Sequence, residues 1–143
     1  MPALRTTSIN RVGLAVDTSA SVNRDELEQF SGELNAILAS VRPNVVDFFE
    51  VDTRIAGHTE LTPEDYPLEV RYRGRGGTEF YPVFNHYKEA FEQPDCLIYL
   101  SDGECGYGGI EEPPFPVLWV FTSGYNEEYY GRPPFGTLIV FDE

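Results

Sequence analysis

Short runs of β-branched and aromatic residues recur along the chain, and they set its predicted architecture. Several runs are continuously apolar, as expected of strands covered on both faces of a sheet. Stretches long enough for a helix or an extended loop separate them. The five predicted strands are residues 12–16, 45–51, 96–100, 117–121 and 137–141.

A helix is predicted between the first two strands, because apolar residues recur there at helical spacing on one face. Asn23 followed by Glu26 suits an N-cap with a reciprocal partner, and Pro43 stops the helix. The predicted inward face is Leu27, Phe30, Leu34, Ile37, Leu38 and Val41.

A second helix is predicted after Pro82, and its inward residues are expected to be Val83, Phe84, Tyr87 and Phe91. Strand, helix and strand repeated in this way require right-handed crossovers and a mainly parallel sheet. The fold class is therefore α/β. Two weaker strands are expected, one in an antiparallel edge hairpin around residues 52–55 and one at residues 68–72.

After residue 102, the segments between the predicted strands no longer have the pattern of helices. Residues 103–116 and 123–136 are rich in Gly, Pro and Tyr and lack helical periodicity. We therefore expect the last strands to lack helices over one face. Aromatic loop residues folding over that face are the favoured cover, with a partner protein as the alternative. These residues are Tyr107, Phe115, Tyr125, Tyr129, Tyr130 and Phe135.

Composition narrows the function classes. With 143 residues, the chain is expected to form one domain over residues 1–143. Its 24 acidic and 10 basic residues give a net charge of −14, which repels nucleic acids and anionic membranes. This charge has two possible explanations. It keeps the protein soluble, or it forms an acidic surface that attracts cations or a basic partner. No signal-peptide layout or membrane-length apolar run is present, so a cytoplasmic protein is expected.

Soft metal ligands are few and scattered. Cys96 and Cys105 have no C-x-x-C spacing, which argues against a disulfide framework or a zinc site. His58 and His86 are expected to have surface or packing roles. Cys105 lies close in sequence to Asp102, and we expect it to be an ordinary loop thiol. Acidic loop residues are expected to be solvated, with an acidic rim around a site as the alternative: Glu79, Glu104, Glu111 and Glu112.

Oxygen-bearing side chains gather where two predicted strands end. Asp17, Ser19 and Ser21 follow the first strand, and Asp102 follows the third strong one. Ligands of open α/β sheets bind beyond the carboxyl ends of the strands, so these side chains are expected at one edge. Thr78 precedes the second helix, whose start we expect at the opposite edge, with the preceding glycines permitting an excursion back.

This set of two carboxylates and three hydroxyls is entirely oxygen. Such ligands suit hard divalent cations, with Mg²⁺ preferred and Mn²⁺ or Ca²⁺ as alternatives. Neutral hydroxyl ligands leave the cation strongly electrophilic. It would therefore accept a carboxylate from another molecule as a further ligand.

The sequence resembles the von Willebrand factor A (VWA) family, and specifically the short bacterial and phage VWA-like domains found alone or behind a putative metallopeptidase domain. The resemblance spans nearly the whole chain and rests on residues 12–21 (VGLAVDTSAS), 76–84 (GGTEFYPVF), 98–103 (IYLSDG) and 116–120 (PVLWV).

The resemblance implies a Rossmann-like VWA fold with strand order 3-2-1-4-5-6 and an antiparallel third strand. It also implies a metal-ion-dependent adhesion site (MIDAS) and a threonine loop that reaches the carboxyl edge. Ser19 and Ser21 would be direct ligands, Thr78 a direct or water-mediated one, and Asp17 and Asp102 would act mainly through water. A MoxR-type AAA+ ATPase is an implied partner. Full-size relatives have helices where this chain has residues 103–116 and 123–136.

The leading hypothesis is a non-enzymatic, metal-dependent protein-interaction module. A metal-dependent phosphatase of the haloacid dehalogenase type is the rival, but Ser19 occupies the position of its general acid, and a hydroxyl cannot serve as that acid at neutral pH. Serine-nucleophile and H-E-x-x-H metallopeptidase motifs are missing. A metal-free scaffold, in which the same side chains only hydrogen-bond one another, is the third alternative.

Overall fold

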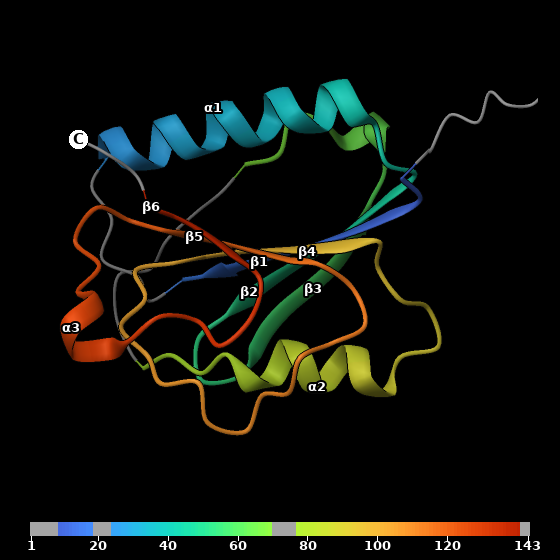
Figure 1. Ribbon diagram of the computed structural model, residues 1–143. Coiled ribbons are helices and arrows are strands. Elements are labelled where there is room, and N and C mark those ends of the chain that lie inside the picture. The colour runs from blue at the N-terminus through green and yellow to red at the C-terminus, as the bar shows by residue number, and fades with distance from the viewer. Residues whose placement is uncertain (1–8, 19–23, 70–76, 141–143) are drawn as a thin grey trace, which may run out of the picture.

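A computed structural model describes residues 9–18, 24–69 and 77–140 of the chain. They form one six-stranded sheet in the order β3-β2-β1-β4-β5-β6 (Figure 1), as the resemblance to the VWA family implied. The elements are β1 (Arg11–Asp17), α1 (Arg24–Val41), β2 (Val45–Val51), β3 (Ile55–Leu61), the 3-10 turn η1 (Pro63–Asp65), α2 (Tyr81–Glu89), β4 (Cys96–Ser101), β5 (Val117–Phe121), α3 (Glu127–Tyr130) and β6 (Thr137–Val140).

Strand β1 lies in the centre of the sheet, and all seven of its residues are buried. It pairs in parallel with β2 and β4, so the carboxyl ends of these three strands lie at one edge. β3 is the antiparallel strand of the predicted edge hairpin. The predicted strand at residues 68–72 is not formed at Leu68 and Glu69, and its other residues lie outside the described ones.

Helix α1 and the segment with η1 lie over one face of the sheet, whereas α2 and α3 lie on the other (Figure 1). Phe30, Leu34 and Leu38 of α1 are buried against Val12, Leu14 and Val16. The predicted inward face was too broad, since Ile37 is 48% exposed and Val41 is 41% exposed. The buried apolar residues of α1 recur every fourth position and so form a narrow stripe along the helix. The proposed cap Asn23 lies outside the described residues.

Helix α2 covers the opposite face through Val83, Phe84 and Tyr87, as predicted. The prediction for Phe91 was wrong, because this side chain is 99% exposed. The helix ends at Glu89, and Ala90 has an extended backbone (φ −74°, ψ 143°). Phe91 therefore no longer follows the helical periodicity that would have turned it inward.

Aromatic loop residues supply the cover that helices would otherwise give to the end of the sheet. Phe115 is buried in the core on the α2 side, and Tyr107, Tyr125 and Phe135 pack against that core. These four rings therefore cover the face of the sheet, as predicted. Tyr129 does not, because its side chain is 78% exposed. The expectation of no helix here was wrong for one turn, α3, which Asn126 caps by accepting a hydrogen bond from the Tyr129 N–H.

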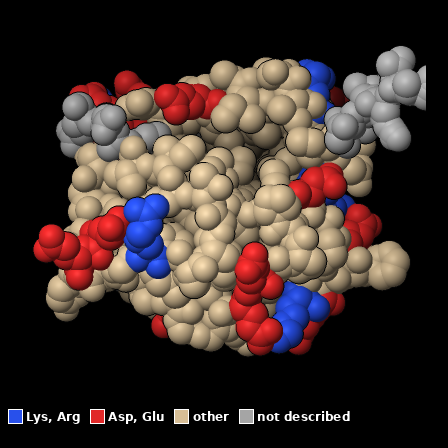
Figure 2. All heavy atoms as spheres, viewed as in Figure 1, with Lys and Arg blue, Asp and Glu red and all other residues tan. Residues whose placement is uncertain are grey.

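The edge strand β6 is only partly covered, and Ile139 is 46% exposed. Figure 2 shows that the centre of this side of the molecule is mostly uncharged, while acidic side chains gather at its borders, including the end near α3. Among the described residues, no helix is both long and apolar enough to cross a membrane.

A charged network lies at the amino edge of the sheet. Arg11, at the start of β1, donates hydrogen bonds to Asp47 (2.6 Å), Glu60 (2.8 Å) and Glu92 (2.6 Å). Asp47 is 2% exposed and also accepts a hydrogen bond from the Tyr87 hydroxyl at 2.7 Å. A buried carboxylate is tolerated only when it is paired and hydrogen-bonded, and Asp47 is both.

Gly13 makes room for this network. A Cβ atom at Gly13 would lie 2.6 Å from the Tyr87 hydroxyl. We expect Gly13→Ala to displace that hydroxyl from Asp47 and to lower the free energy of unfolding by about 2 kcal/mol. Gly32→Ala is the matched control, because Gly32 lies in α1 with no atom near its Cβ position. The control should raise stability by about 0.5–1 kcal/mol in urea unfolding. Equal effects of the two changes would contradict this role of Gly13.

His86 makes stability depend on pH. Burial lowers its pKa and the neighbouring His58 lowers it further, with Asp47 opposing them. Because an unfolded His titrates near about pH 6.5, the unfolded chain binds more protons than the folded one as pH falls through that value. The contribution of His86 to stability is therefore fully present above about pH 6.5 and is lost below it. In thermal unfolding, His86→Gln should reduce the fall in Tm between neutral and mildly acidic pH. An unchanged slope would assign the pH dependence to other groups.

Candidate metal centre

The buried carboxylate of Asp17 is the centre of the candidate site. Asp17 is the last residue of β1 and is 0% exposed. The Thr78 hydroxyl lies 3.1 Å and 3.0 Å from its two carboxylate oxygens, and the Ser101 hydroxyl donates to Oδ2 at 2.8 Å. Three segments far apart in sequence therefore converge on one carboxylate.

Asp102 follows directly after β4, beside the end of β1. It is 6% exposed, and its Oδ1 accepts a hydrogen bond from the Glu104 N–H. The next residue, Gly103, has φ +76°, and a Cβ there would lie 2.4 Å from the Tyr125 ring. Only glycine fits this turn without strain. The structure thus brings Asp17 and Asp102 to the same edge, as expected from the parallel strands.

Thr78 reaches the same edge, and the expectation that α2 starts at the opposite edge was wrong. A helix that runs antiparallel to the strands begins where the parallel strands end, so Thr78, three residues before α2, lies there directly. The Glu79 N–H donates to Asp52 O at 2.9 Å, which ties this segment to the β2–β3 turn. The Cys105 thiol donates to Thr78 O at 3.2 Å.

Ser19 and Ser21, the other two predicted ligands, lie outside the described residues. The described residues on either side are anchored at the carboxyl edge. The N–H and hydroxyl of Thr18 donate to Val51 O at 2.9 Å and 3.1 Å. In the first turn of α1, buried Glu26 accepts hydrogen bonds from the N–H and hydroxyl of Ser123, both at 2.8 Å.

Negative charge is concentrated at this edge. Burial raises the pKa of Glu104, and the nearby carboxylates of Asp102 and Asp17 raise it further, partly through a hydrogen bond with Asp102. Burial raises the pKa of Cys105 to about 11, so this thiol is protonated at neutral pH. Cys105 is thus a free, protonated thiol in a loop, as expected, and it acts as a hydrogen-bond donor.

These side chains fit a hard cation better than a soft one. Carboxylate and hydroxyl oxygens are the groups brought together, and hard divalent cations prefer such ligands. Within the described ranges, no three His, Cys, Asp or Glu side chains are placed to hold a metal by themselves. A cation here would therefore depend on hydroxyl ligands as well.

Two positioning residues were missed by sequence reasoning. Ser101 is 0% exposed, donates to Asp17 and accepts from the Gly103 N–H at 3.1 Å. A polar residue closing an apolar strand just before Asp102 was the available signal. Cys105 had no comparable signal, because its contact with Thr78 depends on how two loops pack.

The sequence of the chain matches a known protein family. The family model described as VWA-like domain (DUF2201) matches residues 12–142. The chain belongs to this VWA-like family. The six-stranded order with one antiparallel pair agrees with a VWA-like fold. No curated protein and no solved structure matches the chain.

In this VWA-like domain, Ser101→Ala would leave the Gly103 N–H and an Asp17 oxygen without their shared partner. We expect the free energy of unfolding to fall by about 1–3 kcal/mol, the usual cost of an unsatisfied buried polar group. Ser40→Ala, on the exposed side of α1, is the control and should change stability by less than about 0.5 kcal/mol. Urea unfolding measures both. A Ser101→Ala protein as stable as the control would show that this hydroxyl is dispensable.

Proposed function

We propose that this VWA-like domain is a metal-dependent protein-interaction module. One divalent cation, Mg²⁺ in preference to Mn²⁺ or Ca²⁺, is held at the carboxyl edge by side-chain oxygens. A carboxylate from the partner protein completes its coordination. The proposed ligands, direct or through water, are Asp17, Ser19, Ser21, Thr78 and Asp102.

The hydrogen-bonded carboxylate of Asp17 carries this proposal. It is fully buried, yet the donors on its oxygens include two neutral hydroxyls, from Thr78 and Ser101. A second buried carboxylate, Asp102, lies at the end of the neighbouring strand. Two buried carboxylates and two hydroxyls at one edge of the sheet supply the oxygen ligands that a hard divalent cation prefers.

Recognition by a carboxylate follows from the chemistry of the ligands. Two carboxylates neutralise a dication, but hydroxyl ligands are weak donors and leave it electrophilic. Glu104 stands beside Asp102 as an exposed acidic residue, which favours partners with basic residues near their metal-binding carboxylate. VWA-like domains are generally interaction modules without catalytic activity, and a MoxR-type AAA+ ATPase is the first partner to test.

Metal binding is tested by adding Mg²⁺, Mn²⁺ or Ca²⁺ and measuring heat and thermal unfolding. Binding to the folded state alone should stabilise the protein by about 2.7 kcal/mol when free cation exceeds its Kd about a hundredfold. Asp17→Asn should abolish both the heat and the stabilisation, because it removes a central charge. Asp25→Asn, an exposed position in the first turn of α1, is the matched control and should retain both.

Absence of heat and of stabilisation with all three cations in the wild-type protein would refute the metal site. The same cation response in Asp17→Asn as in Asp25→Asn would place binding elsewhere on the acidic surface. A measurable response in the folded wild type that is lost only in Asp17→Asn supports the proposal.

Partner binding is tested with immobilised wild-type protein and a purified MoxR-type ATPase, with Mg²⁺ or with chelator. We expect capture with Mg²⁺, loss with chelator, and loss in Ser19→Ala. Capture that survives both treatments would contradict a metal-mediated contact. Ser40→Ala is the control for the serine substitution.

A further inference from the structure

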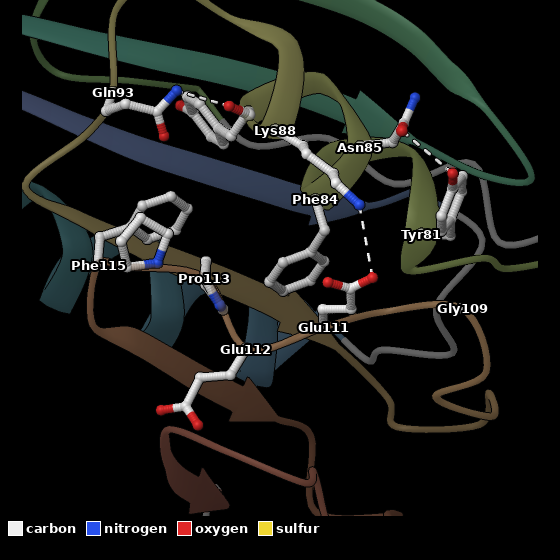
Figure 3. A pocket seen from close by; sticks show the side chains of 12 residues that line it. Tyr81, Phe84, Asn85, Lys88, Gln93, Gly109, Glu111, Glu112, Pro113 and Phe115 are labelled. Carbon is white, nitrogen blue, oxygen red and sulfur yellow. Dashed lines mark hydrogen bonds and ion pairs between the residues drawn. The ribbon is translucent and has the colours of Figure 1, made fainter.

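Two features lie beside helix α2, a pocket and a pair of histidines. The pocket, of about 200 Å³, is lined by Phe84, Lys88 and Phe115 among others (Figure 3). His86 does not line it. The His86 ring lies edge to face against that of His58 in strand β3, with the ring centroids 4.9 Å apart and the planes at 79°. These two residues are the only histidines of the chain.

The ring of Phe49 in β2 supports both imidazoles. Phe49 is 0% exposed. The His58 ring stacks on it at a centroid distance of 4.3 Å with the planes 15° apart, and the His86 ring meets it at 5.2 Å and 70°. Neutral rings prefer such stacked and edge-to-face contacts. One cluster of rings therefore joins β2, β3 and α2.

The buried carboxylate beside the pair can compensate one imidazolium ion better than two. Asp47 Oδ1 lies 3.6 Å from His58 Nε2, close enough for an ion pair once His58 is protonated. The same carboxylate already accepts hydrogen bonds from Arg11 and from the Tyr87 hydroxyl. Burial lowers the pKa of His86, and His58 lowers it further, with Asp47 opposing them.

The other acidic groups around the pair compensate its charge less. Glu60 of β3 and Glu92, which follows α2, both bond to Arg11, and their side chains are 61% and 59% exposed. Water and salt therefore screen them. Glu89, one turn along α2 from His86, is exposed as well. A second proton on the pair thus enters beside a positive charge that the chain only partly neutralises.

Strand β3 is the element that can yield to this repulsion. It is an edge strand that pairs with β2 alone, and none of its seven residues is buried. In contrast, all seven residues of β1 are buried. Local opening costs least where few buried contacts are made, so β3 opens more readily than the centre of the sheet.

We propose that His58 and His86 form a pH-sensitive contact between β3 and α2. At neutral pH both imidazoles are uncharged, and their packing on Phe49 holds β3 against the helix. In mild acid the two imidazolium ions repel each other, and β3 opens while the rest of the sheet stays paired. This contact does not depend on the proposed cation.

The direction of the response follows from proton linkage. An imidazole released by opening titrates near about pH 6.5, whereas His86 in the closed contact resists protonation at that pH. The open form therefore binds more protons below about pH 6.5 and gains population there, and the closed form prevails above it. Two unit charges with ring centroids 4.9 Å apart in a partly hydrated setting change such an equilibrium about tenfold.

Native-state hydrogen exchange at pH 7 and pH 5 tests the proposal, with each amide rate divided by its intrinsic rate at that pH. We expect the opening constant of the β3 amides to be about tenfold larger at pH 5. Strand β6 is the matched internal control, because it is the edge strand at the other end of the sheet and pairs with β5 alone. Its opening constant should stay unchanged.

Two substitutions keep an aromatic ring in the contact and remove its charge, His58→Phe and His86→Phe. Each alone should reduce the acid response of β3, and the double variant should abolish it. His58→Phe should also raise the pH midpoint at which the His86 Hε1 resonance titrates in NMR spectra, because the neighbouring positive charge is gone. Thermal unfolding at pH 7 should show that the variants are folded.

The wild-type protein alone can overturn the proposal. Equal opening constants of the β3 amides at the two pH values would do so, as would a response of β6 as large as that of β3. An acid response that persists in the double variant would assign it to other groups. An unchanged His86 midpoint in His58→Phe would show that the two imidazoles are not coupled. Either of these results also overturns the proposal.

Discussion

The hydrogen bonds to the Asp17 carboxylate hold the carboxyl edge of the sheet together. This one group joins the end of β1 to the segment before α2 through Thr78, and to the end of β4 through Ser101. Ser101 in turn fixes the Gly103 N–H and so the turn that contains Asp102. The loop geometry at the candidate site therefore depends on the buried carboxylate of Asp17. The parallel pairing of β1 with β2 and β4 fixes the position of this carboxylate.

The two ends of β1 show two ways of keeping charge inside a protein. At the amino edge, Arg11 faces three carboxylates, and the buried Asp47 has both a cation and the Tyr87 hydroxyl as partners. At the carboxyl edge, the Thr78 and Ser101 hydroxyls contact Asp17, and burial together with the neighbouring acidic groups raises the pKa of Glu104. The first arrangement pairs the buried Asp47 with a cation of the chain itself. The second gathers carboxylate and hydroxyl oxygens, the ligands that a hard cation prefers, which is why the proposed function lies there.

Aromatic loop residues cover much of the sheet on the α2 side. Their rings cover the end of the sheet, and Trp119 is fully buried among them with its N–H bonded to Phe135 O at 3.0 Å. Large rings bury much apolar area from few residues and keep offset or edge-to-face contacts with one another. The same loop, packed against α2, leaves the pocket beside Lys88. The loop thus covers the sheet and also leaves a recess beside α2.

The sequence by itself determined the main strands and both main helices, since apolar runs and helical spacing are local properties. The ligand set that it names stays a prediction. It also predicted that Asp17 and Asp102 share an edge, because parallel strands end together. It placed Phe91 inward because periodicity cannot show where α2 ends, and it misjudged the position of Thr78, which depends on the direction of α2 relative to the sheet. Only the tertiary structure brought Ser101, Thr78 and Cys105 onto one network, because contacts between residues so far apart in sequence follow from strand order and loop packing, which no local pattern encodes.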